Sequence, residues 1–409
     1  MLINYFLFLV ALLAFAGLAL DTGLMQWRAL RLQQAADAAA QEAMYEYARN
    51  DSNWSAAGLS LAAQNGFTNG VNGVTVTVAS PPSAGLYAGD TSAIQATVSQ
   101  SYSALLMRFL APGAFTVSSS ATAKVISTCV WIMNATGSTS TTGDYGTFHL
   151  ASTTLNASTC GVFVNTTSAG YNLGVDYFST LISARTRVVG PSSMNLSTGT
   201  VSPQAKFGAA TKNDPLAYVT APTFSACNHT NATYSFNGYT INPGTYCGGL
   251  TINTATVDMN PGLYIITGNL SISAGSVFGS GITFYMTKGG GSGYGTVQIT
   301  NSSFFSVSAP TTSSGGALAG IVFFEDRGYV NHNAQSISFD NSTVKTDGIW
   351  YALNTGISST STSFRSAGSY LGVVIDNFYS YLGATTFLAN YSSLGEVSPY
   401  HYDDGVLVQ

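Results

Sequence analysis

The chain has 409 residues, which is enough for two or three domains, and a formal net charge of −5. Only 8% of its residues are charged, whereas an average soluble domain has about 25%. This sparse charge, without a basic tract, argues against nucleic acid as a partner. It also argues against an enzyme, because most catalytic sites recruit ionisable groups.

The chain starts with an apolar run over residues 2–20, in which Asn4 is the strongly polar residue. As a helix this run would be roughly 28 Å long, which is enough to cross the hydrocarbon core of a bilayer. Residues 24–49 continue with good helix formers and no proline. The sequence therefore predicts one long helix, and we assign residues 1–50 to an N-terminal hydrophobic or assembly helix.

Three functions compete for this helix: a cleaved signal peptide, a membrane anchor, and an assembly helix that packs against copies of itself. No basic residue precedes the run, whereas Arg28 and Arg31 follow it, which conflicts with an exported chain unless a basic leader has been removed. We therefore favour the assembly helix. Its expected contact residues are Leu2, Tyr5, Phe6, Leu9, Leu12, Leu13, Phe15, Leu18 and Asp21.

Small side chains gather in the second half of the helix. Because small residues let helix backbones approach closely, this flank fits helix–helix association, although alanine is also simply a good helix former. The alanines concerned are Ala29, Ala35, Ala36, Ala38, Ala39, Ala40 and Ala43.

The motifs AGLALD at 16–21 and LQQAADAAA at 32–40 resemble the N-terminal segment of TadG/TadE-type proteins of bacterial Tad (Flp) pilus machinery. This resemblance implies a type IV pilin-like chain that is exported and processed by a prepilin-type peptidase. Asn4 and Tyr5 stand where pilin-like helices usually carry a glutamate that pairs with the N-terminus, so the chain departs from the family pattern at this point.

Residues 51–124 predict a small α+β head. We expect helices over 53–67 and 102–110, and strands over 74–78, 93–100 and 115–125, from periodicity and from the flanking proline and glycine signals. The order of these elements again resembles TadG-type proteins, which implies a pilin-like head.

Residues 125–409 predict a β-rich solenoid, with a parallel β-helix as the favoured fold and a β-sandwich as the alternative. The motif Asn-Pro-Gly-x-Tyr ends at Tyr246 and again at Tyr264, and short β runs follow at intervals near 20 residues. The whole chain is thus α+β and mainly β. The expected strand centres are Tyr264, Phe284, Phe304, Phe323, Trp350 and Val373.

Four cysteines lack C-x-x-C spacing, which leaves a zinc or thioredoxin-like site unsupported and suggests two disulfides in an oxidising compartment. We expect neighbour pairing, Cys129 with Cys160 and Cys227 with Cys247, among three possible connectivities. The 20-residue spacing of the second pair is one coil of a solenoid, so the two cysteines would stack.

About twelve N-x-S/T sequons occur, which makes glycosylation possible, although a Ser/Thr/Asn-rich surface produces sequons by itself. The sequon asparagines we select are Asn134, Asn156, Asn228, Asn231, Asn269 and Asn341.

A β-helix can host polysaccharide-cleaving sites, which need clustered carboxylates. Glu325, Asp326 and Arg327, with His332, Asp340 and Asp347 nearby, could converge, but we interpret the first three as a solvated turn with a local ion pair. Asp144, Asp176 and Asp258 look isolated, the run 401–404 reads as a solvated tail, and we expect most of the solenoid's aromatic side chains in its core or corners. We therefore predict no catalytic residue, no metal site and no cofactor.

The resemblance implies a structural subunit of an extracellular Tad-type filament. Its helices would bundle in the filament core and its β-rich domain would be exposed for surface contact or adhesion. Its partners would be copies of itself, the pilus assembly machinery, the peptidase and, before assembly, the inner membrane. The alternatives are a minor assembly or tip component and a membrane-anchored β-helix that binds or cleaves polysaccharide.

Overall fold

The structure is a computed structural model that describes residues 2–48, 51–103, 113–134, 147–167, 172–190, 194–195, 198–224, 226–289, 293–312, 318–332, 334–394, 399–400 and 404–408. The chain divides into two compact units. The first contains residues 1–125 together with 403–409, and the second contains residues 126–402. The last strand thus returns to the first unit.

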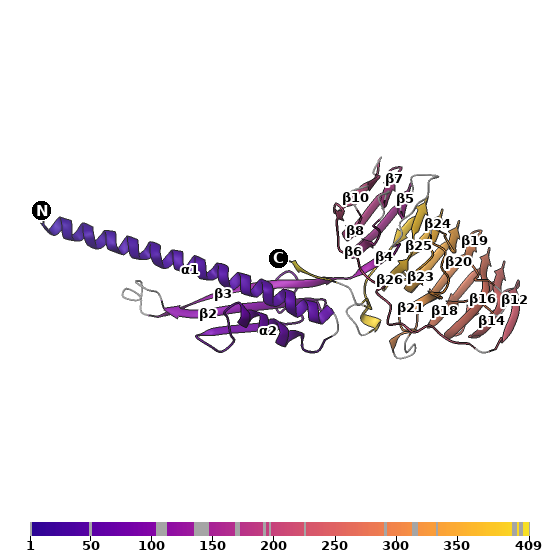
Figure 1. The fold of residues 1–409 in the computed structure, drawn as a ribbon, viewed down its shortest axis with the longest axis horizontal. Coiled ribbons are helices and arrows are strands. Elements are labelled where there is room, and N and C mark those ends of the chain that lie inside the picture. The colour runs from indigo at the N-terminus through magenta and orange to yellow at the C-terminus, as the bar shows by residue number, and fades with distance from the viewer. Residues whose placement is uncertain are drawn as a thin grey trace. The chain divides into compact units, whose positions relative to one another are not determined.

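The first unit combines one long helix, one short helix and a four-stranded sheet (Figure 1). Helix α1 (Leu2–Ala48) is followed by α2 (Trp54–Gln64). The sheet has the order β1-β2-β3-β29, and β1, β2 and β3 are antiparallel. The strands are β1 (Val74–Ala79), β2 (Ala93–Ser103), β3 (Ala114–Ile126) and β29 (Asp404–Val408).

These elements agree with the predicted helix and strands of the head, with one difference. Tyr102 and Ser103, the start of the helix expected over 102–110, are the last residues of β2, where they pair with Phe115 and Ala114. Residues 104–112 lie outside the described part of the chain. More buried and less buried side chains alternate along β2 through Tyr102. These two positions are therefore strand and not helix.

The second unit is a parallel β-solenoid, as predicted, in which each full coil has three sides joined by corners. We call the sides A, B and C in chain order. Side A holds β4 (Thr128–Ile132), β11 (Lys206–Phe207), β18 (Ile282–Met286), β21 (Ile321–Glu325) and β26 (Leu371–Ile375). Side B holds β5 (Phe148–Ala151), β7 (Leu173–Asp176), β9 (Met194–Asn195), β19 (Val297–Thr300), β22 (Ile337–Asp340), β24 (Ile357–Thr360) and β27 (Phe378–Tyr381).

Side C holds β10 (Thr200–Ser202), β13 (Tyr239–Ile241), β15 (Thr256–Met259), β17 (Ser276–Gly279), β20 (Phe304–Ser308), β25 (Ser363–Arg365) and β28 (Ala384–Thr386). Longer strands bend through a corner. From A to B these are β12 (His229–Tyr234), β14 (Gly244–Asn253) and β16 (Gly262–Ser273). From C to A they are β6 (Thr154–Val164), β8 (Thr180–Val188) and β23 (Thr343–Ala352).

The inward column of side A explains the predicted period. Tyr264, Phe284, Phe323, Trp350 and Val373 follow one another in register, from β16 to β26. We expected Phe304 to belong to the same column, and this prediction was wrong. Phe304 lies on side C, where it pairs with Ser276 and Thr343. An insertion before β21 lengthens that coil, so a fixed 20-residue step lands on the wrong side.

The Asn-Pro-Gly-x-Tyr motif closes a corner through its own tyrosine. The Tyr246 hydroxyl donates to the carbonyl of Asn242 at 2.6 Å, and the Tyr264 hydroxyl donates to that of Asn260 at 2.7 Å. The amide of Asn260 also donates to the side chain of Asn242 at 2.8 Å, which links the two coils. The repeat thus encodes a turn and the start of side A together.

The coils do not stack in simple chain order. Strands β26, β27 and β28 of the last coil pair with β4, β5 and β6 of the first coil. The early coils therefore extend from the middle of the solenoid in one direction, and the late coils return to the middle from its other end, which starts at β12. Contacts between residues this far apart in sequence leave no local signal, so this topology was not predicted.

Two non-strand segments cover the outer face of side A. Leu216 and Val219 from the segment before β12, and Tyr391, Leu394 and Tyr400 near the end of the unit, are buried there. They pack against outward side chains of the ladder: Trp131, Phe163, Ile265, Tyr285, Phe324, Tyr351 and Val374. Side A is consequently apolar on both faces, which is why its strands read as continuous hydrophobic runs.

Candidate functional site

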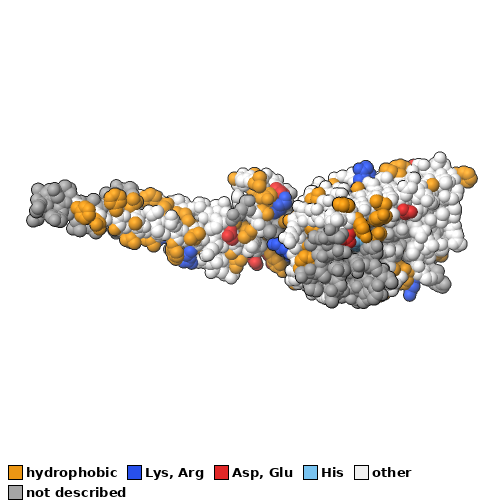
Figure 2. All heavy atoms as spheres, turned by 90° about the horizontal axis from the view of Figure 1, so that it is seen from above, with side chains coloured by type: hydrophobic (Ala, Val, Ile, Leu, Met, Phe, Trp, Pro, Cys, Tyr) orange, Lys and Arg blue, Asp and Glu red, His pale blue; other side chains and the backbone are white. Residues whose placement is uncertain are grey.

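Helix α1 presents apolar side chains to solvent over its described N-terminal half. Phe15 is 74% exposed and Phe8 is 67% exposed. Figure 2 shows hydrophobic side chains, in orange, at intervals along the helix. Further exposed positions are Leu12, Leu18, Leu20, Leu24, Met25, Trp27 and Leu30. The described residues of the unit leave these side chains exposed to solvent, which is the pattern of a surface that is buried by association.

Of the expected contact residues of this helix, Leu12, Phe15 and Leu18 are exposed and Asp21 is half-buried. The side chains of Leu2, Tyr5, Phe6, Leu9 and Leu13 lie outside the described part of the structure, although their backbone is helical. Among the described residues, no helix is both long enough and apolar enough to span a membrane, so the predicted transmembrane helix is not confirmed.

The alanine flank of α1 is used within the chain, which corrects the prediction that it serves contacts between copies. Ala35, Ala36, Ala39, Ala40 and Ala43 are fully buried in the first unit. Helix α2 approaches so closely that a Cβ on Gly58 would lie 2.9 Å from the carbonyl oxygen of Ala39 and 3.0 Å from Cβ of Ala43. Ala29 and Ala38 are only half-buried.

The carboxylate cluster predicted as a solvated turn is not one. Glu325 ends β21 and is 2% exposed; its carboxylate accepts hydrogen bonds from Ser336 at 2.7 Å and from Thr355. Burial raises the pKa of this carboxyl to about 7, although the two hydroxyl donors lower it. Successive side chains at the end of β21 point to opposite faces, so that Phe323 lies in the core and Phe324 lies outside it. Glu325 is on the same face as Phe323 and therefore points into the interior.

Arg327 does not pair locally with Glu325 or Asp326, which is a second correction. Its guanidinium donates to the carbonyls of Leu216 at 2.7 Å and Val219 at 2.8 Å, and lies 3.4 Å from the carboxylate of Asp214. It also donates to the Tyr351 hydroxyl at 2.6 Å. Arg327 therefore fastens the segment around Leu216 onto side A.

The remaining candidate acids lie apart from Glu325. Asp326 accepts a hydrogen bond from Thr287 at 2.6 Å, and Asp340 is exposed at the end of β22 on side B. Asp347 accepts hydrogen bonds from Ser366 and from the backbone of residues 367–369, which orders that turn. Glu325 and Asp340 thus lie on opposite faces of the solenoid wall.

Two histidine–aspartate pairs were missed in the sequence. His149 Nε2 lies 3.1 Å from Asp176, which had been read as isolated, and both are buried. Burial lowers the pKa of His149, and Asp176 opposes this shift. His332 Nδ1 lies 2.7 Å from the buried Asp376, which also accepts from Asn134. Partners so distant in the chain carry no motif.

Within the described residues no group of three His, Cys, Asp or Glu side chains could hold a metal ion. Asp144 and the tail residues 401–403 lie outside the described part, as does the side chain of Asp404, and Asp258 lies exposed on β15.

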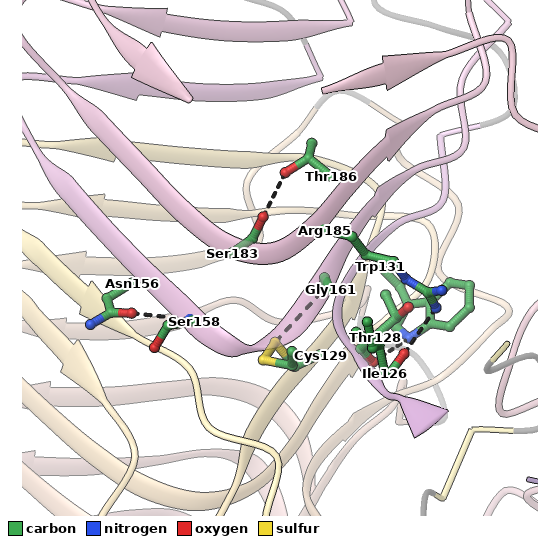
Figure 3. The surroundings of a disulfide bond; sticks show 11 residues. Ile126, Thr128, Cys129, Trp131, Asn156, Ser158, Gly161, Ser183, Arg185 and Thr186 are labelled. Carbon is green, nitrogen blue, oxygen red and sulfur yellow. Dashed lines mark hydrogen bonds between the residues drawn. A yellow bond between two sulfur atoms is a disulfide. The ribbon is translucent and has the colours of Figure 1, made fainter. Parts of the chain in front are cut away.

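The disulfides follow the predicted neighbour pairing. Cys129 and Cys160 join β4 to β6 inside the wall, and Figure 3 shows Cys129 with its disulfide bond near Gly161. Cys227 and Cys247 join the start of the β12 coil to β14 at the exposed end of the solenoid. The expected stacking of equivalent positions was wrong here, because Cys247 pairs in register with Thr230.

Burial also bears on the six selected sequons. Asn134 is fully buried and its amide donates to Asp376 at 3.1 Å, so this position does not suit a glycan, which corrects that prediction. The side chains of Asn228, Asn231, Asn269 and Asn341 are exposed and that of Asn156 is half-buried. For these five, glycosylation stays a prediction.

Residues 5–49 match the family model described as Flp pilus-assembly TadE/G-like. The N-terminal helix is similar to that of TadE/G-like proteins. No curated protein matches the chain, and no solved structure does. The TadE/G-like match coincides with α1 and indicates a role in Flp pilus assembly and a location at the cell surface or membrane. It includes the exposed apolar half of the helix as well as the half that packs against α2.

Proposed function

We propose that the chain is a structural subunit of an extracellular Tad-type filament, whose N-terminal helices bundle in the filament core. The observation that carries this proposal is the exposed apolar surface of a TadE/G-like helix, from Phe8 to Leu30. Burying one such phenylalanine contributes about 2–3 kcal/mol, so a helix with many of them is strongly driven to associate.

The remainder of the chain suits the outside of such a filament. The first unit would then correspond to a pilin head, because α1, which would associate through its N-terminal half, packs through its C-terminal half against α2 and the sheet. The solenoid carries few charges and two disulfides, which suits an exported surface coat for contact or adhesion. Before assembly, the apolar helix would associate with the inner membrane and meet the prepilin-type peptidase and the assembly machinery.

The test is microscopy of filaments sheared from cells, with quantification of this chain in the sheared material. We expect the chain in filaments, and we expect Phe15→Glu to remove it from them, because a carboxylate would enter the apolar bundle. The matched control is Phe236→Glu, since Phe236 is 73% exposed on the solenoid and Phe15 is 74% exposed on α1.

A chain that remains in the membrane fraction as single copies would overturn the filament subunit. A trace amount at filament ends would instead identify a minor tip component. Equal loss of both variants from the sheared material would mean that exposed charge, rather than the helix, decides incorporation.

A further inference from the structure

A shallow groove of about 360 Å³ crosses the corner between sides B and C over three neighbouring coils. Its volume lies within the range of small-ligand sites, which is about 300–1,000 Å³. Hydroxyl and amide side chains line it throughout: Ser302, Ser303, Asn341, Ser342, Thr343, Ser361 and Ser363.

The corner backbone holds these side chains outward. Ser302, Asn341 and Ser361 occupy the left-handed region, with φ of 63°, 44° and 49°, and all three are exposed. The preceding coils turn at the equivalent corner with φ of 55° at Thr254 and 51° at Ala274. The groove is therefore the polar stretch of a regular row of corners.

The groove floor is fixed by hydrogen bonds. The Ser342 hydroxyl donates to the carbonyl of Ile299 at 3.2 Å, and the amide of Asn341 lies 3.4 Å from the Ser302 hydroxyl. Ser303 donates to the carbonyl of Thr300 at 2.5 Å. A ligand would meet an ordered surface and would cost little conformational entropy in the protein.

Phe304 directly follows Ser303 of the groove lining, and its ring contacts that of Phe278 on the preceding coil. Phe304 pairs in register with Thr343, which lines the groove, and its ring centroid lies 5.6 Å from that of Phe278. Phe304 is half-buried and Phe278 is 36% exposed. Their neighbours Phe305 and Val277 occupy the core, so both phenylalanines project from the outer face of side C. An open apolar ring beside a row of hydroxyl groups offers two kinds of contact at one place.

We propose that this groove binds a neutral oligosaccharide. Sugar hydroxyls both donate and accept hydrogen bonds, as do serine, threonine and asparagine side chains, and the apolar C–H face of a sugar ring can cover an aromatic ring. The lining carries no charge, and Asp340, which precedes Asn341, is a further acceptor for hydroxyl groups. Lys345 and Arg365 lie in the same register row as Phe278 on side C, so a charged sugar is included in the test to show whether charge governs binding.

The experiment measures binding by titration calorimetry of the full chain in detergent with maltopentaose, cellopentaose, mannopentaose and chitopentaose. Pentagalacturonate is the charged comparison. The first variant is Asn341→Gly with Ser361→Gly, which removes polar groups from the groove and keeps corners that glycine adopts readily. The second is Phe278→Ala, and the control is Phe236→Ala, an exposed phenylalanine elsewhere on the solenoid.

We expect at least one neutral pentasaccharide to bind with a Kd below about 1 mM, and each groove variant to weaken it about three- to tenfold. The control should bind like the wild type, and circular dichroism should show that all variants are folded. Absence of binding by the four neutral sugars, or binding that both groove variants leave unchanged, overturns the proposal. Tighter binding of pentagalacturonate also overturns it.

Asn301 and Asn341 both begin sequons at this corner, so an attached glycan is the competing occupant. Mass spectrometry of the chain purified from its own cells distinguishes a bound oligosaccharide from an attached glycan. A glycan on either asparagine would occupy the groove and overturn the binding proposal. The binding proposal stands independently of filament assembly, because calorimetry uses dispersed chains.

Discussion

At the scale of single residues, Arg327 shows how one side chain fixes a segment that has no regular structure of its own. Its guanidinium satisfies the carbonyls of Leu216 and Val219, which would otherwise be buried beside the apolar outer face of side A. Asp214 and Tyr351 complete its surroundings. The side chain thus acts between distant parts of one unit.

We predict that Arg327→Met lowers the free energy of unfolding by about 3 kcal/mol, because hydrogen bonds to a charged group contribute about 1.5–3 kcal/mol. Urea unfolding measures this loss, and limited proteolysis should show cleavage in residues 208–224. The control is Arg365→Met, since Arg365 is an exposed arginine of β25. An equal effect of the two substitutions would contradict the role of Arg327.

Glu325 predicts a dependence of stability on pH. Its folded pKa is about 7 because the carboxyl is buried, whereas the ordinary pKa of a glutamate carboxyl is 4.5. Between these values the folded state binds the proton and the unfolded state does not, so the free energy of unfolding falls as pH rises from about 4.5 to 7. The fall from this group is about 3 kcal/mol.

Glu325→Gln should therefore remove this fall, since glutamine resembles the protonated acid. We expect the variant to match the wild type in urea unfolding near pH 4.5 and to be more stable than the wild type at pH 8. Asp340→Asn, at an exposed position of the next strand, should leave the pH dependence as it is. A wild type and Gln variant with parallel pH profiles would refute this interpretation of Glu325.

The sequence predicted the column of Tyr264, Phe284 and Phe323 because stacked coils repeat their inward apolar residues at the same place. It did not predict the interior position of Glu325. The run before it is apolar throughout and lacks the alternation that tells an inward from an outward residue, and its hydroxyl partners Ser336 and Thr355 come from later coils. The groove escaped notice for a similar reason, because serine and asparagine at separate corners form no motif.

At the scale of elements, the β12 coil is the weak end of the solenoid. Strand β12 pairs with β14 on one side, and Phe236 and Tyr239 of this coil are exposed. An edge strand of this kind opens readily unless it is tied down. The bond between Cys227 and Cys247 ties it to the next coil.

Replacing both cysteines, with Cys227→Ser and Cys247→Ser, should release this coil alone. The loss of loop closure corresponds to about 3 kcal/mol, or about a 100-fold rise in amide exchange. Hydrogen exchange should change over residues 229–241 and leave the central coils protected. Cys129→Ser with Cys160→Ser is the comparison, because that bond is buried between central coils and its loss should destabilise the whole unit.

At the scale of the whole molecule, the solenoid is completed only when its last coil is in place. Val373 of β26 is fully buried and pairs in register with Trp350 on one side and Val130 on the other. The early coils and the late coils therefore share one continuous core through this coil. Folding must bring together residues that are far apart in the chain, which makes the final coil the step that closes the unit.

We predict that Val373→Asp divides the solenoid, because a buried, unpaired carboxylate costs several kcal/mol at a position with core on both sides. Trp131 and Trp350 report the change, since both are 1% exposed and lie on the coils next to Val373. Their fluorescence should shift to longer wavelength without denaturant.

Val201→Asp, on a half-buried strand of the other end coil, should unfold in urea as one transition and keep both tryptophans buried. If both variants unfold alike, the last coil holds no special position in the fold. A selective effect at Val373 would show that the two runs of coils are one cooperative unit because their junction lies in its centre.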